Sequence, residues 1–164
     1  IVSAGSSPTA RHAEILAGIT EMRAGVYMFG DLFQAEIETH GMDGIAVTVL
    51  TSVIGRGTGK LLVDAGGLAL SKDRSTEGAP HDYGYGLVLD RMGRRSFGST
   101  IVSRAYQEHG VIEYRTPIEL DLPIGALLRI APNHTCMTSA AHDRYYVVDG
   151  GDEVVAVWPR VNGW

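Results

Sequence analysis

The stretch between Ile45 and Ile54 constrains the fold more than any other part of this chain, because its side chains alternate with a period of two. One face carries Ile45, Val47, Val49, Thr51 and Val53, and the other carries Ala46, Thr48, Leu50 and Ser52. Both faces are largely apolar, which predicts a central strand of a sheet. The glycine-rich run 55–59 then predicts a turn, with residues 61–65 pairing back as a hairpin.

Further short apolar runs follow at a spacing that is typical of an all-β domain. Residues 26–29, 87–89, 101–103, 111–112, 127–131, 144–148 and 154–158 each predict a strand, whereas residues 32–40 fit a short helix or a loop. The 21 glycines of the chain separate many of these runs. The pattern predicts a mainly β fold, either a sandwich or a barrel. The polar segment 71–86 predicts a long loop with a functional or an interface role.

The composition excludes several classes of protein. With 164 residues, the chain is long enough for one domain with a real core. Its net charge is -5 and it has no cluster of lysine and arginine, which argues against a nucleic-acid partner. The chain has no run of about 18 apolar residues, so its sequence predicts no membrane span. The single cysteine excludes an internal disulfide and predicts a reducing, cytoplasmic location. Because the chain opens with Ile1 and has no signal-peptide pattern, we expect it to start within a longer protein or after processing.

The cysteine, Cys136, stands two residues after His134 in the run 131–137. If the backbone is extended here, alternate side chains share a face, so the imidazole and the thiol point the same way. A histidine nitrogen and a thiolate form half of a zinc-like ligand set. Such a half-set suits an open metal site that is completed by water, substrate or another segment. A buried thiol beside a loop histidine is the alternative that spacing alone leaves open.

A second candidate site lies at the start of the chain. Residues 1–4 predict the end of a short buried strand, and residues 5–9 predict a turn into a helix that runs from Pro8 to Leu16 and ends at Gly18. Ser7 fits the N-cap and Pro8 fits the first helical position. A strand, a Gly-Ser turn and a helix N-terminus together predict an anion site. An ordinary β-turn-α connection fits the same residues.

A third candidate is the run 107–110, in which Glu108 stands beside His109. An acid next to an imidazole is compatible with a functional site. A solvated turn fits this spacing equally well, so the sequence leaves both interpretations open.

Taken in order, several segments of the chain resemble one known enzyme family. They are residues 2–9, 20–27, 63–66, 108–110, 132–136, 145–148 and the terminal Gly163-Trp164. The series resembles the C-terminal part of the pyridoxal-phosphate (PLP) enzymes grouped as D-serine dehydratase and D-threonine aldolase, and it covers the whole chain. The resemblance implies an alanine racemase-like, fold-type III architecture. Residues 1–24 would be the strand-helix-strand end of the PLP-binding (β/α)8 barrel, and residues 25–164 a C-terminal β-domain with the metal site.

The resemblance also implies residue roles. Gly5, Ser6, Ser7, Thr9 and Tyr27 would bind the cofactor. His134 and Cys136 match the metal pair of the family, which holds zinc, manganese or magnesium, and the thiolate favours zinc. Asp31, Glu108 and His109 match family positions without an assigned role, and His109 is the candidate catalytic residue. Gln107 departs from the Glu of many dehydratases, which leaves the substrate open. The family's Schiff-base lysine lies upstream, and neither Lys60 nor Lys72 matches its motif, so this segment alone should lack it.

The activity implied by the resemblance is that of a lyase acting on β-hydroxy D-amino acids. The reaction would be dehydration of D-serine or D-3-hydroxyaspartate, or retro-aldol cleavage of D-threonine, with the metal polarising the β-hydroxyl. The family also implies a homodimer, to which the loop around Tyr83 and Tyr85 and the terminal Trp164 could contribute buried contacts. Two alternatives remain: an amino-acid racemase of the same fold without a metal, and a non-catalytic stand-alone β-domain that binds a partner.

Overall fold

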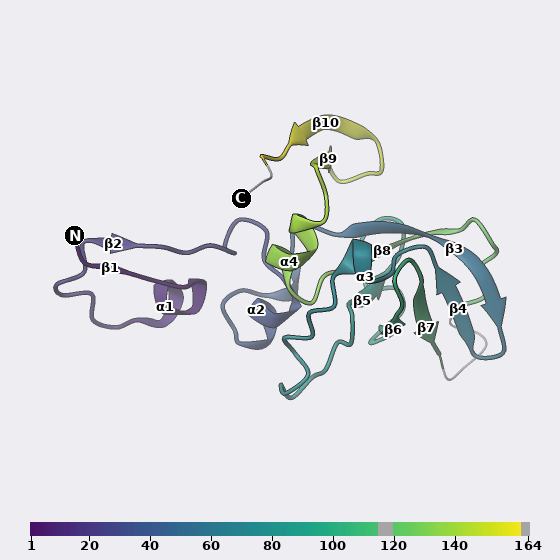
Figure 1. Cartoon of the computed structure of the whole chain (residues 1–164), viewed down its shortest axis with the longest axis horizontal. Helices are drawn as coiled ribbons and strands as arrows, with labels where there is room; N and C mark the ends of the chain where they lie inside the picture. The colour runs from purple at the N-terminus through teal and green to yellow at the C-terminus, as the bar shows by residue number, and fades with distance from the viewer. Residues whose placement is uncertain (115–119, 162–164) are drawn as a thin grey trace.

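Strands dominate the structure, as the sequence predicts (Figure 1). The computed structural model describes residues 1–114 and 120–161. The strands are β1 (Ser3–Ala4), β2 (Glu21–Met22), β3 (Val49–Gly57), β4 (Lys60–Val63), β5 (Leu87–Leu89), β6 (Val102–Ala105), β7 (Gly110–Glu113), β8 (Leu127–Ala131), β9 (Arg144–Val148) and β10 (Val154–Pro159). The helices are α1 (Ser7–His12), α2 (Leu32–Glu36), the 3-10 helix η1 (Met42–Gly44), α3 (Gly67–Leu70) and α4 (Thr135–Ala140). None of these helices is long and apolar enough to cross a bilayer.

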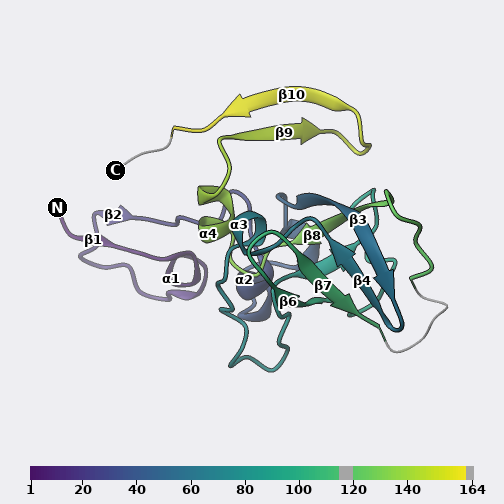
Figure 2. The same ribbon diagram turned by 45° about the vertical axis from the view of Figure 1, so that its right-hand side comes forward.

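Six strands form a single curled antiparallel sheet in the order β5-β8-β3-β4-β7-β6. Hydrogen bonds also join the two ends of this order. The N–H of Tyr85 donates to the carbonyl of Val102, the N–H of Val102 donates to the carbonyl of Gly86, and Leu87 pairs with Ile101. Because β5 and β6 meet, the sheet rolls up as a partly closed barrel rather than a sandwich (Figure 2).

The strand predicted to be central, β3, lies in the middle of this sheet. It pairs with β8 through Val49–Ser52 and with β4 through Val53–Gly57, and the pairing with β4 has a register shift between Val53 and Gly55. Its start differs from the prediction, because the N–H of Ala46 donates to Phe29 and Ile45 packs beside α2 instead of entering the sheet. The hairpin turn is shorter than the predicted run 55–59. It consists of Thr58 and Gly59, and Gly59 adopts a φ of 68°.

The core lies inside the curled sheet and is built from strand residues that alternate inward. Val53, Leu61, Val63, Val88, Val102, Ile112, Leu128 and Ile130 are essentially inaccessible to solvent. Burying each such side chain contributes about 1.5–3 kcal/mol to folding. A second, smaller cluster on the outside joins Leu32 of α2 to Leu87, Leu89 and Ala131. This cluster attaches α2 to the ends of β5 and β8, close to the predicted metal pair.

The first residues form a separate strand-helix-strand unit at one end of the molecule (Figure 1). β1 and β2 pair in parallel, and α1 connects them. The predicted helix is too long, since α1 ends at His12, and the residues that follow it, including Ile15 and Leu16, are exposed. A helix this short gains its stability from packing, and no other described element covers this one. The parallel β1-α1-β2 order is that of a barrel repeat.

The predicted strand over residues 26–29 is wrong. These residues form a turn, in which the N–H groups of Phe29 and Gly30 both donate to the carbonyl of Val26. Tyr27 and Met28 are exposed on it, so their high β-propensity finds no neighbouring strand to pair with. The ambiguous segment 32–40 begins with the short helix α2, whose N-cap is Asp31.

The last two strands, β9 and β10, form a two-stranded ribbon outside the curled sheet (Figure 2), and Arg129 of β8 donates to the carbonyl of Gly151 in its turn. The ring of Tyr145 lies 5.0 Å from the ring of Phe29, and the side chain of Arg160 donates to the carbonyls of Ser139 and His142. These contacts attach one end of the ribbon to α4 and to the turn before α2. Trp164, which the sequence suggests for an interface, lies outside the described residues.

Candidate metal centre and cofactor turn

His134 and Cys136 both lie at the start of α4, directly after β8. The predicted extended backbone continues only as far as His134, which is the N-cap residue with φ -139° and ψ 105°. The helix begins at Thr135, so Cys136 lies within its first turn, and the premise of two side chains on one face of a strand is wrong. The helix starts at Thr135 because two groups far away in the sequence, the side chain of Asp31 and the carbonyl of Gly30, accept hydrogen bonds from this residue.

Asp31 is the main one of these acceptors. Its side chain is completely buried, and its Oδ2 accepts the N–H of Thr135 at 2.9 Å while its Oδ1 accepts the N–H of Gln34 at 2.8 Å. The hydroxyl of Thr135 also donates to the carbonyl of Gly30. One carboxylate therefore caps both α2 and α4. Sequence patterns assign Asp31 no role, whereas in the structure its carboxylate accepts the hydrogen bonds that start both helices.

The imidazole of His134 is held by a carboxylate from the long loop 71–86. Its Nδ1 lies 2.5 Å from Oδ2 of Asp73, and the hydroxyl of Ser75 donates to Oδ1 of the same carboxylate at 2.6 Å. Burial alone would raise the pKa of Asp73, but the hydrogen bonds from Ser75 and His134 outweigh it and hold the pKa below its ordinary 3.8. Nδ1 is thus engaged, and Nε2 is the nitrogen that can bind a metal.

Asn133 attaches this loop to the end of β8. Its side-chain amide donates to Oγ1 of Thr76 at 2.8 Å and to the carbonyl of Gly84 at 2.7 Å, and its oxygen accepts the N–H of Thr76 at 3.1 Å. Asn133 and Thr76 are both buried. The loop that carries Asp73 is therefore fixed to the residue next to His134. The prediction that this loop has a functional role rested on its length, and nothing in the sequence singled out Asp73 or Thr76.

The surroundings of Cys136 are negative. Neighbouring protein atoms raise the pKa of its thiol above 9.0 although part of the residue is exposed, and the charges of Asp31 and Asp73 raise it further. The same negative field favours a divalent cation, which displaces the thiol proton when it binds. An imidazole nitrogen, a thiol and this field fit a soft divalent metal such as zinc. Within residues 1–114 and 120–161, no group of three histidine, cysteine or acidic side chains gathers, so the pair would form an open site.

The predicted cofactor turn connects β1 to α1. Ser6, not Ser7, is the N-cap, because its Oγ accepts the N–H of Thr9 at 3.2 Å. Ser7 is buried and accepts the N–H of Val26, which brings the turn that holds Tyr27 next to the start of the helix. The N–H groups of Gly5, Ser6 and Ser7 donate no hydrogen bond within the described part of the chain. Unpaired N–H groups at a helix start suit a phosphate.

The third candidate, Glu108 with His109, lies in the exposed turn between β6 and β7. The carbonyl of His109 accepts the N–H of Tyr106, and the carbonyls of Tyr106 and Gln107 accept the first N–H groups of α3. The backbone carbonyls of this turn therefore accept the hydrogen bonds with which α3 begins. The structure describes no hydrogen bond from the side chain of His109 and brings it into no cluster with His134 and Cys136, so a catalytic role for His109 stays a prediction.

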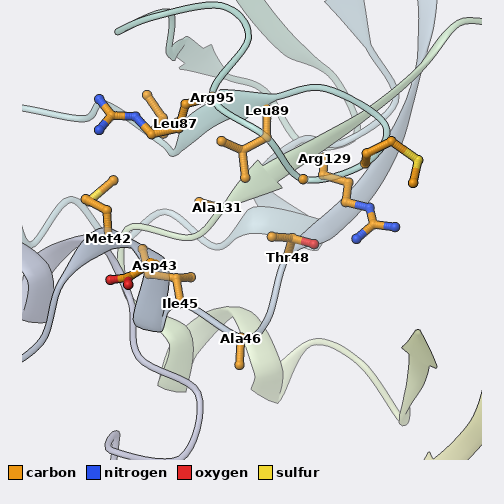
Figure 3. Close-up of a pocket in the computed structure, with 12 residues that line it drawn as sticks. Met42, Asp43, Ile45, Ala46, Thr48, Leu87, Leu89, Arg95, Arg129 and Ala131 are labelled. Atoms are coloured by element: carbon orange, nitrogen blue, oxygen red, sulfur yellow. The ribbon is translucent and has the colours of Figure 1, made fainter. Parts of the chain in front are cut away.

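A hollow of about 250 Å3 lies on the outer side of β5 and β8, between η1 and the turn that follows β5 (Figure 3). Its lining includes Asp43, Ile45, Leu89, Arg129 and Ala131. Neither His134 nor Cys136 lines it, and the cofactor turn is remote from it in the sequence and in the fold. The hollow is therefore separate from both predicted sites.

Comparison with known proteins assigns the chain to a family. The family described as "Putative serine dehydratase domain" matches residues 46–148. D-threo-3-hydroxyaspartate dehydratase of Delftia sp. is 41% identical over 171 residues, and D-serine dehydratase of Schizosaccharomyces pombe is 32% identical over 177 residues. The chain is covered to 100% and 99%, but it spans only 44% and 40% of these two enzymes. An uncharacterized protein of Mycobacterium tuberculosis is 28% identical over 126 residues, 74% of this chain and 86% of that protein.

Solved structures agree with this assignment. An alanine racemase-like protein of Idiomarina loihiensis matches 100% of this chain and 44% of its own, with 42% identity and a TM-score of 0.90. D-threo-3-hydroxyaspartate dehydratase with a cysteine replaced by alanine, in the metal-free form, matches 100% of this chain and 45% of its own, with 40% identity and a TM-score of 0.91. A second structure of that enzyme has a histidine replaced by alanine, two positions before the cysteine. D-threonine aldolase of Filomicrobium marinum, at 24% identity and a TM-score of 0.73, shares the fold over 96% of this chain and 40% of its own.

The architecture is therefore that of the C-terminal part of an alanine racemase-like fold. Since the family match extends over residues 46–148, the chain belongs to the serine dehydratase domain family.

Proposed function

We propose that this chain is the C-terminal part of a PLP- and divalent-metal-dependent lyase that acts on β-hydroxy D-amino acids. One observation carries the proposal: a histidine held by a carboxylate through Nδ1 stands two residues before the single cysteine, at the buried end of β8. D-threo-3-hydroxyaspartate dehydratase has solved structures with alanine at a histidine and at a cysteine with the same spacing, the cysteine variant in its metal-free form. This coincidence supports a metal pair at His134 and Cys136.

The metal would be held by Nε2 of His134 and the sulfur of Cys136, with water and substrate at its other positions. When bound, it supplies a Lewis acid next to the β-hydroxyl of the substrate. The chain itself provides the support for this pair. Asp73 keeps the hydrogen on Nδ1 of the imidazole, and Asp31 fixes the first turn of α4, in which Cys136 lies.

We further propose that residues 1–24 are the end of the PLP-binding barrel and residues 25–164 the β-domain. Gly5, Ser6, Ser7 and Thr9 would bind the cofactor phosphate through the turn into α1, with Tyr27 close by through the contact between Ser7 and Val26. Exposed apolar side chains of this unit, such as Val2 and Ile15, support a larger barrel that covers them. The cofactor supplies the electron sink for the reaction.

The Schiff-base lysine would lie in a part of the protein outside this chain. Lys60 stands beside a hairpin turn, and Lys72 donates to the carbonyl of Ala105 while it lies over the ring of Tyr85. Neither environment resembles that of a Schiff-base lysine, which needs access to the cofactor. We also propose a cytoplasmic homodimer, as the resemblance and the single cysteine imply.

Dehydration of D-serine or D-3-hydroxyaspartate is the preferred activity, because the relatives at 41% and 32% identity are both dehydratases. Retro-aldol cleavage of D-threonine needs the same metal next to the same hydroxyl, so the metal pair alone does not distinguish the two. An amino-acid racemase would have no use for the pair. The short relative from Mycobacterium tuberculosis, of which this chain covers 86%, supports a second candidate: a β-domain that exists without a barrel and binds a partner.

The test is product analysis of the full-length protein with D-serine, D-threo-3-hydroxyaspartate and D-threonine, with and without a chelator. Dehydration releases ammonia and a 2-oxo acid, whereas retro-aldol cleavage of D-threonine releases glycine and acetaldehyde. We expect ammonia from at least one of the first two substrates, and its loss in chelator. Racemisation that persists in chelator would contradict the proposal. A full-length protein without PLP and without turnover would favour the stand-alone β-domain.

A further inference from the structure

We propose that Asp73 is the positioning residue of the metal centre, which fixes the orientation and the tautomer of His134 so that only Nε2 faces the metal. This inference rests on the proposed function, because it assumes that His134 binds a metal. Its evidence is independent, however, since it comes from the loop 71–86 and from no comparison.

The contact between the two side chains defines the tautomer. Nδ1 of His134 lies 2.5 Å from Oδ2 of Asp73. A carboxylate can only accept, so Nδ1 carries the hydrogen and the lone pair stays on Nε2. The hydroxyl of Ser75 lies 3.4 Å from the same Nδ1, but it donates to Oδ1 of Asp73 at 2.6 Å and does not compete for the ring. Both side chains are 25–30% exposed, so solvent screens the contact only in part.

The segment around Asp73 is held in place without the help of His134. The N–H of Asp73 donates to Oγ of Ser71 at 3.2 Å. Lys72 and Arg74, on either side of Asp73, lie 5.2 Å and 5.5 Å from the ring centre of Tyr85, so both neighbours point to the same ring. Asp73 therefore lies in a segment that is fixed on both sides, as a positioning residue requires.

The loop is also attached to the strand end that carries the imidazole. Asn133, directly before His134, makes three hydrogen bonds to Thr76 and Gly84, and both Asn133 and Thr76 are buried. A buried contact thus joins the residue before His134 to Thr76, three positions after Asp73, and this contact sets the spacing between the carboxylate and the ring. A carboxylate behind a metal-binding histidine typically changes metal affinity 10–100-fold when it is removed.

The experiment measures zinc and manganese affinity of the full-length protein, after metal removal, by competition with a coloured chelator. We expect Asp73→Ala to weaken affinity by about 10–100-fold. Asp73→Asn retains a neutral acceptor for Nδ1 and should lie between Ala and the parent protein. Glu77→Ala is the matched control, because Glu77 is an exposed carboxylate of the same loop that pairs with Arg74 and does not touch His134. It should bind metal as the parent protein does.

Two further readouts separate positioning from loss of structure. The thermal midpoint and the PLP absorbance should stay unchanged in Asp73→Asn. If Asp73→Ala does not fold, the affinity of Asp73→Asn decides, and parent-like affinity in that variant overturns the proposal.

His134→Ala and Cys136→Ala distinguish this proposal from the one on which it rests. If both lose metal while Asp73→Ala and Asp73→Asn bind like the parent, the metal pair stands and the positioning role of Asp73 is wrong. If His134→Ala and Cys136→Ala bind metal like the parent, the proposed metal centre itself is wrong, and the role of Asp73 is overturned with it.

Discussion

The buried carboxylate of Asp31 accepts the backbone N–H of Thr135 at 2.9 Å, across 104 positions of the sequence. The backbone of the two segments is joined as well, since the N–H groups of Leu32 and Phe33 donate to the carbonyls of Pro132 and Asn133. This connection ends β8, starts α4 and fixes the residues on either side of Thr135. His134 and Cys136 are therefore positioned by a segment that contains neither of them.

Replacement of Asp31 by alanine should lower the free energy of unfolding by about 2–3 kcal/mol, because two buried N–H groups lose their acceptor. Asp31→Asn keeps one acceptor oxygen and should cost about half as much. Denaturant titration measures both. Asp43→Ala, which removes an exposed carboxylate from the neighbouring η1, is the control and should change stability by less than about 0.5 kcal/mol. Equal stability of Asp31→Ala and Asp43→Ala would show that the double cap has no energetic role.

Asp31 also illustrates why the candidate site could be predicted only in part. The sequence identified His134 and Cys136 by residue type and spacing, which are local properties. It predicted an extended backbone for them because β8 and Pro132 lead directly into the pair. The helix that forms instead depends on an acceptor 104 positions away, and no pattern near residue 134 contains that information.

Gly5 should tolerate no side chain. It has a φ of 154°, and a Cβ at this position would lie 2.3 Å from the backbone oxygen of Arg23, so Gly5→Ala must displace β2 or the turn. We expect the variant of the full-length protein to bind PLP at least about 10-fold more weakly, which corresponds to about 1.4 kcal/mol. Equilibrium titration with PLP, followed by absorbance, measures this change.

Gly25→Ala is the matched control for Gly5→Ala, because its φ is ordinary and no atom lies within 4 Å of the added Cβ. This variant should bind PLP as the parent does. Equal PLP affinity in the two variants would mean that the turn between β1 and α1 does not contact the cofactor.

The carboxylate of Asp90, in the turn after β5, predicts a pH dependence of stability. It accepts hydrogen bonds from Met92, Arg94 and Ser96. Burial raises its pKa, but these bonds outweigh burial and lower the pKa from 3.8 to about 2. A carboxyl whose pKa is lowered by folding stabilises the fold above its unfolded pKa. That stabilisation, about 2 kcal/mol, is lost as pH falls from about 4 to about 2.

Asp90→Asn should therefore unfold more easily at pH 6 than the parent, and the gap should narrow below pH 4. Thermal unfolding at a series of pH values measures the gap. The exposed Asp149, in the turn between β9 and β10, provides the control, since Asp149→Asn should differ from the parent protein by less than about 0.5 kcal/mol across the series. A gap for Asp90→Asn that stays the same size at pH 2.5 would mean that the lowered pKa is not its cause.

The fold was more predictable than the site because its pattern is local. Residues 127–131 were predicted as a strand and form β8 with the same bounds. The turn at Thr58 and Gly59 follows from glycine chemistry alone. The strand predicted at residues 26–29 is absent, because β-propensity produces a strand only beside a partner strand, and the structure offers these residues none. Whether the strands close into a barrel or stack as a sandwich depends on the contact between Leu87 and Ile101, which no periodicity encodes.

Cys136→Ala in the full-length protein should abolish lyase turnover and leave the PLP absorbance and the thermal midpoint intact. Cys136 is exposed at the start of α4, so loss of its sulfur removes little buried volume. The cofactor would be bound elsewhere, by the turn at Gly5–Ser7 and by the upstream lysine. Met137→Ala is the control, because Met137 is also exposed and stands next in the same helix, and it should retain turnover.

Cys136→Asp is the sharper variant, because it changes the softness of the ligand and keeps a negative charge at the same position. A carboxylate oxygen is a harder ligand than a thiolate, so this variant should regain part of the turnover with manganese or magnesium and less of it with zinc. Steady-state assays with each ion at saturating concentration measure how much turnover each ion restores. If Cys136→Ala instead keeps near-normal turnover in the presence of a chelator, the metal assignment is wrong, and a metal-free racemase becomes the better interpretation.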